Sequence, residues 1–387
     1  MRPPRVAFFT DSYLEANGVA RTSQALEAYA SSRCLPFLCV HAGPHTRFNE
    51  SGAIARLELR RGPVGFQIEH DMAFDLLLWR HYRAAERVLR RFAPDVLHFT
   101  GPSDVGQLGA YLGYRLGIPM VGSWHTNLHE YVSRRVVSHL AWLSDRSRDA
   151  VGFWLERGAL ATAMQFYRIP RALLAPNEEL VRCLAVGTHK PTHLMSRGVD
   201  VQLFSPSLRD RSDDEIRIGY VGRLSAEKNV RMLAAVERTL VASGVTTYRF
   251  VIIGEGSERA WLEQHMTRAE LPGVLRGPAL ARAYADMDLF VFPSETDTVG
   301  NVVLEAMASG VPVIAMTQGG PRFLVEAGVS GLLVSDEREL ADAVLALIRD
   351  RARRERMREA ARARASTLSW DRIFDSVYNV YAQVSRS

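Results

Sequence analysis

Short apolar runs alternate with longer amphipathic stretches along almost the whole chain. The runs have the length of β-strands, and the apolar positions between them recur with the spacing of a helix. Such alternation is typical of parallel sheets built from strand–helix–strand units. We expect strands at residues 5–9, 35–40, 96–99, 120–123 and 165–169, and a second set at residues 216–221, 248–253, 289–292, 313–315 and 331–334. The pattern predicts a protein of the α/β class.

A polar stretch without periodicity, at residues 205–214, separates the two sets of strands. We interpret it as a linker between two domains. Residues 1–204 then form an amino-terminal domain and residues 215–367 a carboxyl-terminal domain, which suits a chain of 387 residues. The sequence ends in an amphipathic helical pattern, and we expect residues 368–387 to pack back on the amino-terminal domain.

The composition is that of an ordinary soluble protein, with 47% hydrophobic and 24% charged residues. A formal net charge of +5 permits contact with an anionic surface without requiring nucleic acid, and we expect no nucleic-acid partner. The three cysteines lack the paired spacing of a disulfide framework or a metal site, which favours a reducing compartment. No apolar run approaches the roughly 20 residues of a membrane-spanning helix. We therefore expect a cytoplasmic protein that would meet the inner face of the cell membrane only from its surface.

Only two lysines occur among the 48 basic residues, and one of them, Lys228, closes the segment GRLSAEKN at residues 222–229. This segment follows the predicted strand at 216–221, so Arg223 and Lys228 lie at the carboxyl end of a strand. Ligands bind at this edge of open α/β sheets, and two cations there suit a diphosphate. The alternative interpretation is an exposed turn with two solvated charges.

A second segment, FPSETDTVGNVVLEAMASG at residues 292–310, runs from a strand through a polar loop into a helix that begins near Gly300. The first amides of that helix have no partner within it, and its dipole favours an anion there. Glu305 lies among apolar positions of the helix, where an unpaired carboxylate would be costly, so it needs a partner. That partner is either a pair of ribose hydroxyls or one of the many arginines. Asp297, eight residues earlier, could also serve only as a loop or helix-capping residue.

The two segments together resemble the retaining nucleotide-sugar glycosyltransferases of the GT-B fold, specifically glycosyltransferase family four. The resemblance is strongest to the branch of sulfoquinovosyl-diacylglycerol synthases and bacterial mannosyl- and glucosyl-lipid transferases, and it covers nearly the whole chain. It implies two Rossmann-like doubly wound domains that face one another across a cleft, the first on the acceptor side and the second binding the nucleotide sugar. No cluster of carboxylates in the sequence resembles the metal site of the other major glycosyltransferase fold, so we expect an enzyme that needs no metal and no cofactor.

In that family an acidic pair eight residues apart binds the donor, and here it falls on Asp297 and Glu305. By resemblance Asp297 would hold a hydroxyl of the donor sugar and Glu305 the ribose, while Arg223 and Lys228 would hold the diphosphate. The first acid of relatives is usually a glutamate followed by glycine. The aspartate found here leaves the identity of the sugar open, and it leaves Glu295 as an alternative first acid.

The resemblance implies a larger set of contacts. The catalytic residues would be His125, Arg223, Lys228 and Asp297, with His125 on the donor sugar. The donor-binding residues would be Gly18, Gly222, Arg223, Lys228, Arg276, Asp297, Val299, Gly300, Asn301, Val302 and Glu305. The acceptor-side residues would be Asn17, Ser103, Asp104 and Thr126. The alternative for Asn17 and Gly18, which stand where relatives carry two glycines, is a plain turn.

These residues do not specify the chemical identity of the donor or of the acceptor. We expect a nucleoside-diphosphate hexose, with UDP favoured by its frequency in the family, and a membrane lipid such as diacylglycerol as acceptor. A soluble small molecule or a polysaccharide is the alternative acceptor. A nucleotide-sugar 2-epimerase of the same fold and an inactive sugar-nucleotide binding protein remain as other classes. A nicotinamide site at Gly254-Glu255-Gly256 is rejected, because the third glycine of that fingerprint is replaced by Arg259.

Residues 79–92 form a basic amphipathic helical pattern with tryptophan and tyrosine at its start. Such a helix can lie on anionic lipid, and each basic residue near the surface contributes about 1 kcal/mol. Its last arginines also complement the helix dipole, which is the ordinary explanation. The pattern predicts a peripheral contact with an anionic membrane.

Overall fold

The computed structural model describes residues 2–15, 18–62, 65–69, 72–75, 77–124, 157–158, 160–297 and 300–386, without the side chains of 65–69 and 72–74. The chain forms two compact units. Unit 1 comprises Met1–Ser196 and Trp370–Ser387, and unit 2 comprises Arg197–Ser369. Each contains a mainly parallel sheet, so the prediction of two α/β domains is confirmed.

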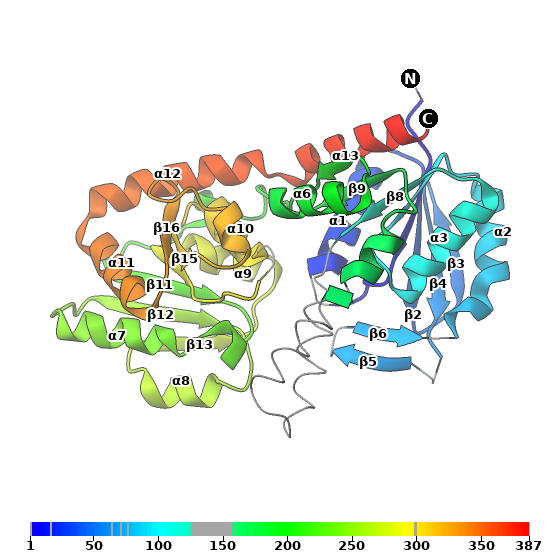
Figure 1. Ribbon diagram of the computed structural model, residues 1–387. Coiled ribbons are helices and arrows are strands. Elements are labelled where there is room, and N and C mark those ends of the chain that lie inside the picture. The colour runs from blue at the N-terminus through cyan, green and yellow to red at the C-terminus, as the bar shows by residue number, and fades with distance from the viewer. Residues whose placement is uncertain are drawn as a thin grey trace. The chain divides into compact units, whose positions relative to one another are not determined.

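Unit 1 contains an eight-stranded sheet in the order β10-β9-β8-β7-β1-β2-β4-β3 (Figure 1). All neighbouring strands are parallel except β3 and β4. A separate antiparallel pair is formed by β5 and β6. The strands are β1 (Val6–Thr10), β2 (Phe37–Gly43), β3 (Arg47–Ser51), β4 (Ile54–Arg60), β5 (Gly65–Glu69), β6 (Met72–Asp75), β7 (Val96–Phe99), β8 (Met120–Ser123), β9 (Ala172–Ala175) and β10 (Thr192–Leu194). The helices are α1 (Gly18–Ser32), η1 (Leu78–His81), α2 (Tyr82–Phe92), α3 (Asp104–Leu116), α6 (Glu178–Thr188) and α13 (Trp370–Val384).

The strand expected at residues 165–169 is wrong. Residues 160–166 are helical, and the Tyr167 amide still donates to the Ala163 carbonyl oxygen at 2.9 Å. The strand lies a few residues later as β9, where four consecutive small and aliphatic residues are buried between β8 and β10. Phe166 and Tyr167 pack their rings on Phe99 and Trp124, so their apolar character serves a helix end.

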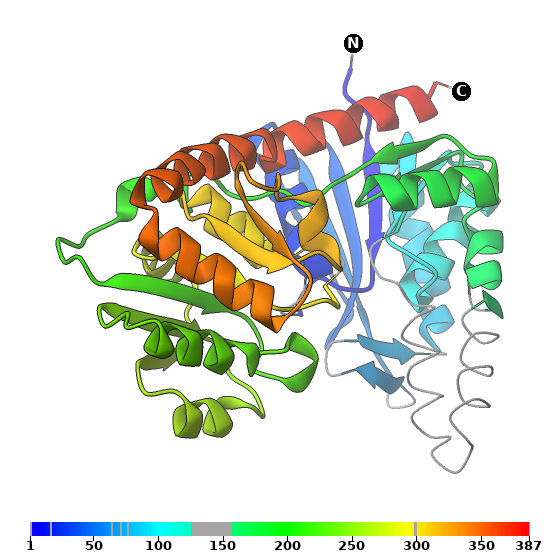
Figure 2. The same cartoon turned by 60° about the vertical axis from the view of Figure 1, so that its left-hand side comes forward.

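The last helix, α13, is part of unit 1, although about 170 residues of unit 2 precede it in the sequence. Figure 2 shows it in red beside the strands of that unit. Phe374 and Tyr381 are fully buried in the core on one side of the sheet, with Phe8 and Leu26. His98 of β7 hydrogen-bonds through Nδ1 to the Tyr381 hydroxyl at 2.6 Å and through Nε2 to Ser123 Oγ at 2.7 Å. This polar contact fixes α13 at the centre of the sheet.

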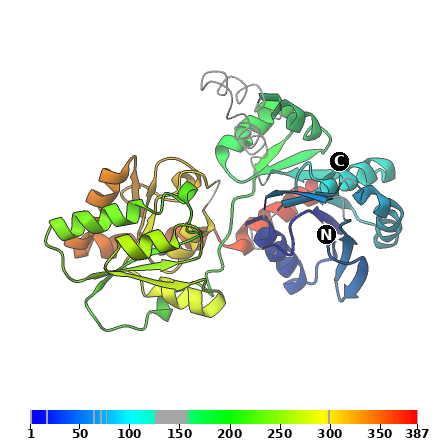
Figure 3. The same ribbon diagram turned by 90° about the horizontal axis from the view of Figure 1, so that it is seen from below.

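Unit 2 contains a six-stranded parallel sheet in the order β13-β12-β11-β14-β15-β16. Helices α7 and α11 pack together on one face, while α9, α10 and α12 cover the other (Figure 1). Figure 3 views unit 2 from the side of α7 and α8. The strands are β11 (Ile216–Val221), β12 (Tyr248–Ile253), β13 (Ala269–Gly273), β14 (Leu289–Phe292), β15 (Val313–Met316) and β16 (Gly331–Val334). The helices are η2 (Pro206–Leu208), η3 (Ala226–Lys228), α7 (Met232–Ala242), α8 (Arg259–His265), α9 (Gly277–Ala285), α10 (Asn301–Ala308), η4 (Gly320–Phe323), α11 (Glu337–Arg349) and α12 (Arg351–Thr367).

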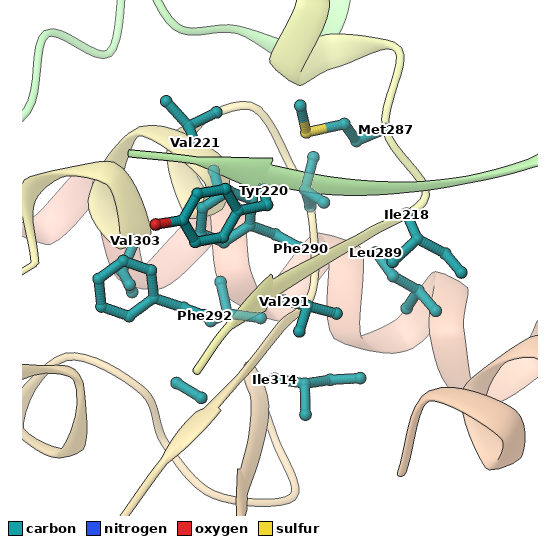
Figure 4. Close-up of a cluster of buried hydrophobic side chains, with 14 of the residues drawn as sticks. Ile218, Tyr220, Val221, Met287, Leu289, Phe290, Val291, Phe292, Val303 and Ile314 are labelled. Atoms are coloured by element: carbon teal, nitrogen blue, oxygen red, sulfur yellow. The ribbon is translucent and has the colours of Figure 1, made fainter. Parts of the chain in front are cut away.

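The central strands β11 and β14 are buried on both faces, as expected for a parallel sheet covered by helices. Figure 4 shows their side chains, among them Tyr220, Phe290 and Phe292, packed with Val303 of α10. This packing fixes the height of α10 above the carboxyl end of β14, where Pro293 begins the segment that carries Asp297.

The polar stretch at residues 205–214 lies in unit 2. Arg209 and Arg211 bind the two carboxylate oxygens of Asp288 at 2.7 and 2.9 Å, immediately before β14. The unit boundary lies earlier in the sequence, between Ser196 and Arg197. The charged residues that gave this stretch its polar pattern are therefore used in a buried ion-pair cluster, since Asp288 is only 6% exposed.

We predict that the buried His98 makes the stability of the protein depend on pH. Burial lowers its pKa to about 3, so the folded chain keeps it neutral, whereas the unfolded chain binds a proton below about pH 6.5. Stability is therefore lost as pH falls below 6.5, and between pH 7 and pH 5 this histidine accounts for about 2 kcal/mol. Urea unfolding of the wild type and of His98→Asn at both pH values measures it. Parallel losses in the two proteins would contradict this assignment.

Candidate active site

The turn that follows β11 presents Arg223 and Lys228. The Gly222 amide donates to the Ile253 carbonyl oxygen at 3.0 Å, and the Tyr220 hydroxyl donates to the Arg223 carbonyl oxygen at 2.9 Å. Lys228 ends the short helix η3, and the left-handed backbone of Asn229, with φ of 53°, stops it. The sequence predicted this position at the carboxyl end of a strand, and the structure places both cations there.

The loop after β12 supports the same turn. A Cβ on Gly254 would lie 1.8 Å from the Gly222 carbonyl oxygen, so only glycine fits here. The Leu224 amide donates to the Glu255 carbonyl oxygen at 2.9 Å, and the Glu258 amide donates to the Leu224 carbonyl oxygen at the same distance. The glycine-rich segment rejected as a nicotinamide site thus has a structural function, because it shapes the turn that carries the cations.

Lys228 and Asp297 form an ion pair, with Lys228 Nζ 2.7 Å from Asp297 Oδ2. The two residues follow β11 and β14, which are neighbours in the sheet, and this adjacency brings them together. Their side chains are 20% and 27% exposed, so the pair is accessible at the carboxyl edge. The capping alternative for Asp297 does not describe this contact, in which its carboxylate binds a cation from another strand.

Arg223 has an acidic neighbour of its own. Its guanidinium lies 3.9 Å from Glu227 Oε1, and the two side chains are 59% and 50% exposed. Burial acts to raise the pKa of the Glu227 carboxyl, but the Ser225 hydroxyl, the backbone amide of Glu227 and the charges of Arg223 and Lys228 outweigh it and lower that pKa. Each cation of the turn therefore has a carboxylate beside it.

The loop that carries Asp297 rests on the loop after β15. The Gly320 amide donates to the Asp297 carbonyl oxygen at 2.6 Å. Gly319 has φ of 81°, and a Cβ there would lie 2.8 Å from the Glu295 carbonyl oxygen and 3.1 Å from that of Asp297. The Glu295 side chain, the alternative first acid, has no ion pair to Lys228 among the described contacts. The structure therefore directs Asp297, rather than Glu295, at the cation.

Glu305 is buried in α10 with 4% exposure. The Tyr284 hydroxyl of α9 donates to Glu305 Oε2 at 3.0 Å. At the start of α10, after the left-handed backbone of Gly300, Asn301 has a buried side-chain oxygen for which the described residues supply no donor. Val302, the next residue, is packed against the core of the unit. Arg276 stands exposed at the start of α9, before Gly277 with φ of 55°.

In unit 1 the predicted acceptor-side residues take part in local hydrogen bonds. The Ser103 hydroxyl caps α3 by accepting from the Gly106 amide at 3.2 Å. The buried Asp104 carboxylate accepts from the amides of Asp75 and Val105 at 2.9 and 2.8 Å. Gly18 is the first residue of α1. Asn17, His125, Thr126 and Val299 lie outside the described residues.

Two residues of interest were missed at the sequence level. No sequence motif indicates Tyr284, because its hydroxyl contacts Glu305 only through the packing of α9 on α10. Asp11 follows β1, where it accepts a hydrogen bond from the Thr100 hydroxyl at 3.1 Å, and burial raises the pKa of its carboxyl. A polar residue directly after a buried strand is the signal that could have found it.

Comparison with solved structures identifies the fold. A sucrose-phosphate synthase from Thermosynechococcus elongatus superposes with a TM-score of 0.72 at 19% sequence identity, over 98% of this chain and 99% of that one. Likeness at this identity shows the fold alone, and that fold is the GT-B fold of glycosyltransferases. The GT-B fold that the resemblance implied is confirmed.

Sequence comparison then gives the family. Residues 16–187 match the family described as Glycosyltransferase Family 4, and residues 215–350 match Glycosyl transferases group 1. A GDP-mannose-dependent alpha-mannosyltransferase of Mycobacterium tuberculosis is 36% identical over 310 residues, which cover 77% of this chain and 75% of that protein. The sulfoquinovosyl transferase SQD2 of Arabidopsis thaliana is 31% identical over 299 residues, which cover 73% of this chain and 55% of that protein. The chain belongs to glycosyltransferase family 4.

We predict that Gly319→Ala destabilises unit 2 more than Gly328→Ala does. Both glycines have φ near 80°, but a Cβ on Gly328 would meet nothing within 4 Å, whereas one on Gly319 would press on the backbone of the Asp297 loop. The positive φ alone costs about 1–3 kcal/mol with alanine, and the backbone overlap at Gly319 adds about 1–3 kcal/mol. Urea unfolding of the three proteins measures the difference. Equal losses in the two variants would show that the loop after β15 does not support Asp297.

Proposed function

We propose that this chain transfers a hexosyl group from a nucleoside-diphosphate sugar to a hydroxyl, with retention of configuration and without a metal ion. The observation that carries the proposal is the meeting of two cations and an acid from neighbouring strands at one edge of the unit 2 sheet, 2.7 Å apart at their closest. Parallel sheets bind ligands at this edge, and paired cations suit a diphosphate. Arg223 and Lys228 hold the diphosphate in this proposal.

The remaining groups of unit 2 fit the rest of a donor. Asp297 accepts from a hydroxyl of the sugar. Glu305 accepts from the ribose hydroxyls, with the Tyr284 hydroxyl keeping one carboxylate oxygen in position. The amides at the start of α10 and the Asn301 oxygen, which has no donor among the described residues, add polar groups beside Gly300. We assign His125 to the donor sugar, and Asn17, Ser103, Asp104 and Thr126 to the acceptor side.

The chemical step that we propose needs no protein nucleophile. The acceptor hydroxyl attacks the anomeric carbon from the face that the diphosphate leaves, the bond to the diphosphate oxygen breaks, and that oxygen takes the hydroxyl proton. The protein contributes position and charge. Each cation about 4 Å from a phosphate contributes roughly 4 kcal/mol at an effective dielectric constant near 20, before desolvation is subtracted.

The donor base and sugar are chosen from the relatives. UDP is frequent in the family, but the mannosyltransferase of Mycobacterium tuberculosis is named as GDP-mannose-dependent. We therefore propose GDP-mannose as the first donor to assay and a UDP-hexose as the second. Arg276 at the start of α9 is the exposed cation that we assign to the nucleotide.

We predict that Lys228→Ala lowers turnover by about a hundred- to thousand-fold, because it removes a charge that stabilises the leaving diphosphate. Release of nucleoside diphosphate from GDP-mannose or UDP-glucose, in the presence of lipid extract and a chelator, measures the turnover. The chain offers a matched control, since Lys190 of unit 1 is the only other lysine. Lys190→Ala should leave turnover unchanged. Turnover of Lys228→Ala within a few-fold of the wild type would exclude the clamp.

The acceptor that we propose is a membrane lipid, and unit 1 has a surface suited to it. Large apolar side chains are exposed at the start of η1 and along α3, with Trp79 at 41%, Tyr111 at 41% and Tyr114 at 78%. Trp79 and Tyr111 stack edge to face at 5.2 Å between ring centroids. Such amphipathic rings are favoured at the level of lipid headgroups. No described helix is long and apolar enough to cross a membrane.

The exposed charges of α2, the helix that follows η1 in the chain, complement an anionic membrane. Arg83, Arg87 and Arg90 lie at i, i+4 and i+7 on the exposed face of α2. The only acid of that helix is Glu86, which is 16% exposed and bound to Arg90 at 2.8 Å. We name Trp79, Arg83, Arg87, Tyr111 and Tyr114 the aromatic–arginine surface and propose that it rests on anionic lipid.

We predict that Arg83→Glu/Arg87→Glu weakens binding to vesicles of phosphatidylglycerol and phosphatidylcholine by at least about tenfold. Each arginine near the surface contributes about 1 kcal/mol, and reversing its charge adds repulsion. Sedimentation with vesicles measures the bound fraction. The exposed residues Arg351 and Arg356 of α12 provide a control with the same change of net charge, and Arg351→Glu/Arg356→Glu should bind as the wild type does. Equal losses in the two double variants would show that net charge, not this surface, governs binding.

A further inference from the structure

Lys228 and Asp297 form an ion pair, although the proposed function assigns them to different parts of the donor. Lys228 is assigned to the diphosphate and Asp297 to the sugar, yet their charged atoms lie 2.7 Å apart. A diphosphate that binds Lys228 must therefore share or displace the carboxylate. The inference that follows rests on the proposed function and concerns what this carboxylate does after the sugar has been transferred.

The backbones that carry the two residues are tied together, so their approach does not depend on two flexible side chains alone. The Asn229 side-chain amide donates to the Pro293 carbonyl oxygen at 3.2 Å, and the Thr296 hydroxyl donates to the Glu227 carbonyl oxygen at 3.5 Å. The Asp297 carbonyl oxygen is held in turn by the Gly320 amide. Lys228 and Asp297 are thus preorganised to meet.

The charges of the turn are balanced in this arrangement. Arg223 has Glu227 at 3.9 Å and Lys228 has Asp297 at 2.7 Å, which gives two positive and two negative groups. The Arg223–Glu227 contact is long, and its side chains are 59% and 50% exposed, so solvent screens it. The Lys228–Asp297 contact is short and less exposed, and it is the stronger competitor for an incoming or departing anion.

We propose that Asp297 promotes release of the nucleoside diphosphate by competing with it for Lys228. While the donor is intact, the hydroxyl of the sugar donates a hydrogen bond to the Asp297 carboxylate. This bond weakens the attraction of the carboxylate to Lys228. Once the sugar has left with the acceptor, the carboxylate has no hydroxyl to bind. It then returns to Lys228, and the diphosphate loses part of its attraction to the turn.

The isosteric variant Asp297→Asn tests this proposal. It keeps the size and shape of the side chain, removes the charge that competes for Lys228 and turns one acceptor oxygen into an NH2 donor. We expect UDP or GDP, whichever the wild type binds, to bind Asp297→Asn about tenfold more tightly, as expected for the loss of one competing charge at a partly exposed site. Isothermal titration calorimetry at low salt measures the affinity, and thermal unfolding checks that each variant is folded.

Two controls separate competition from a general change of charge. Glu215 precedes β11 at the opposite edge of the same sheet and binds Arg249 at 3.0 Å, so Glu215→Gln removes an equal charge from an ion pair away from the turn. It should leave the affinity unchanged. In a Lys228→Ala background Asp297→Asn should give little gain, because the contested cation is gone.

The outcomes distinguish this inference from the proposed function. If the wild type binds neither UDP nor GDP, or Lys228→Ala binds as the wild type does, the diphosphate clamp itself is wrong. If Lys228→Ala loses affinity but Asp297→Asn binds no more tightly than the wild type, only the competition is excluded. A gain that persists in the Lys228→Ala background would instead show direct repulsion between Asp297 and the diphosphate, and it would also overturn the proposal.

Discussion

The ion pair between Lys228 and Asp297 depends on the order of strands in unit 2. Because β11 and β14 are hydrogen-bonded neighbours that run in the same direction, the turn after one and the loop after the other open at the same edge. Gly254 shapes the first and Gly319 supports the second. The chemistry of the site is therefore a consequence of sheet topology, which places residues nearly 70 positions apart within hydrogen-bond distance.

Local chemistry marks some residues of the candidate site in the sequence. Arg223 and Lys228 could be found because two cations directly follow a strand, and Glu305 because a carboxylate interrupts an apolar helix face. Tyr284 and Gly319 could not, since each gains its function only when another element packs beside it. The ion pair of Lys228 with Asp297 could not be predicted either, because it depends on β11 and β14 being neighbours in the sheet.

The fold was predictable to a similar extent. The alternation of apolar runs and amphipathic stretches indicated both sheets, and the final helical pattern within residues 368–387 corresponds to α13. The pattern did not indicate β3, β4, β5, β6, β10 or β13. In β4 the charged positions obscured an apolar run. Glu58 in that strand is nevertheless buried, paired with Arg47 at 2.6 Å. Residues 165–169 were assigned to a strand because periodicity cannot distinguish a short buried strand from a helix end that packs aromatic rings.

Membership of glycosyltransferase family 4 gives the class of chemistry. The candidate site residues are the groups that we propose carry out this chemistry in this chain. The central claim is that Arg223 and Lys228 hold the diphosphate of the donor. A crystal structure of the protein with nucleoside diphosphate bound tests it most directly. The account predicts phosphate oxygens within about 3 Å of Lys228 Nζ and of the Arg223 guanidinium. A diphosphate bound elsewhere, with both side chains in bulk solvent, would contradict it.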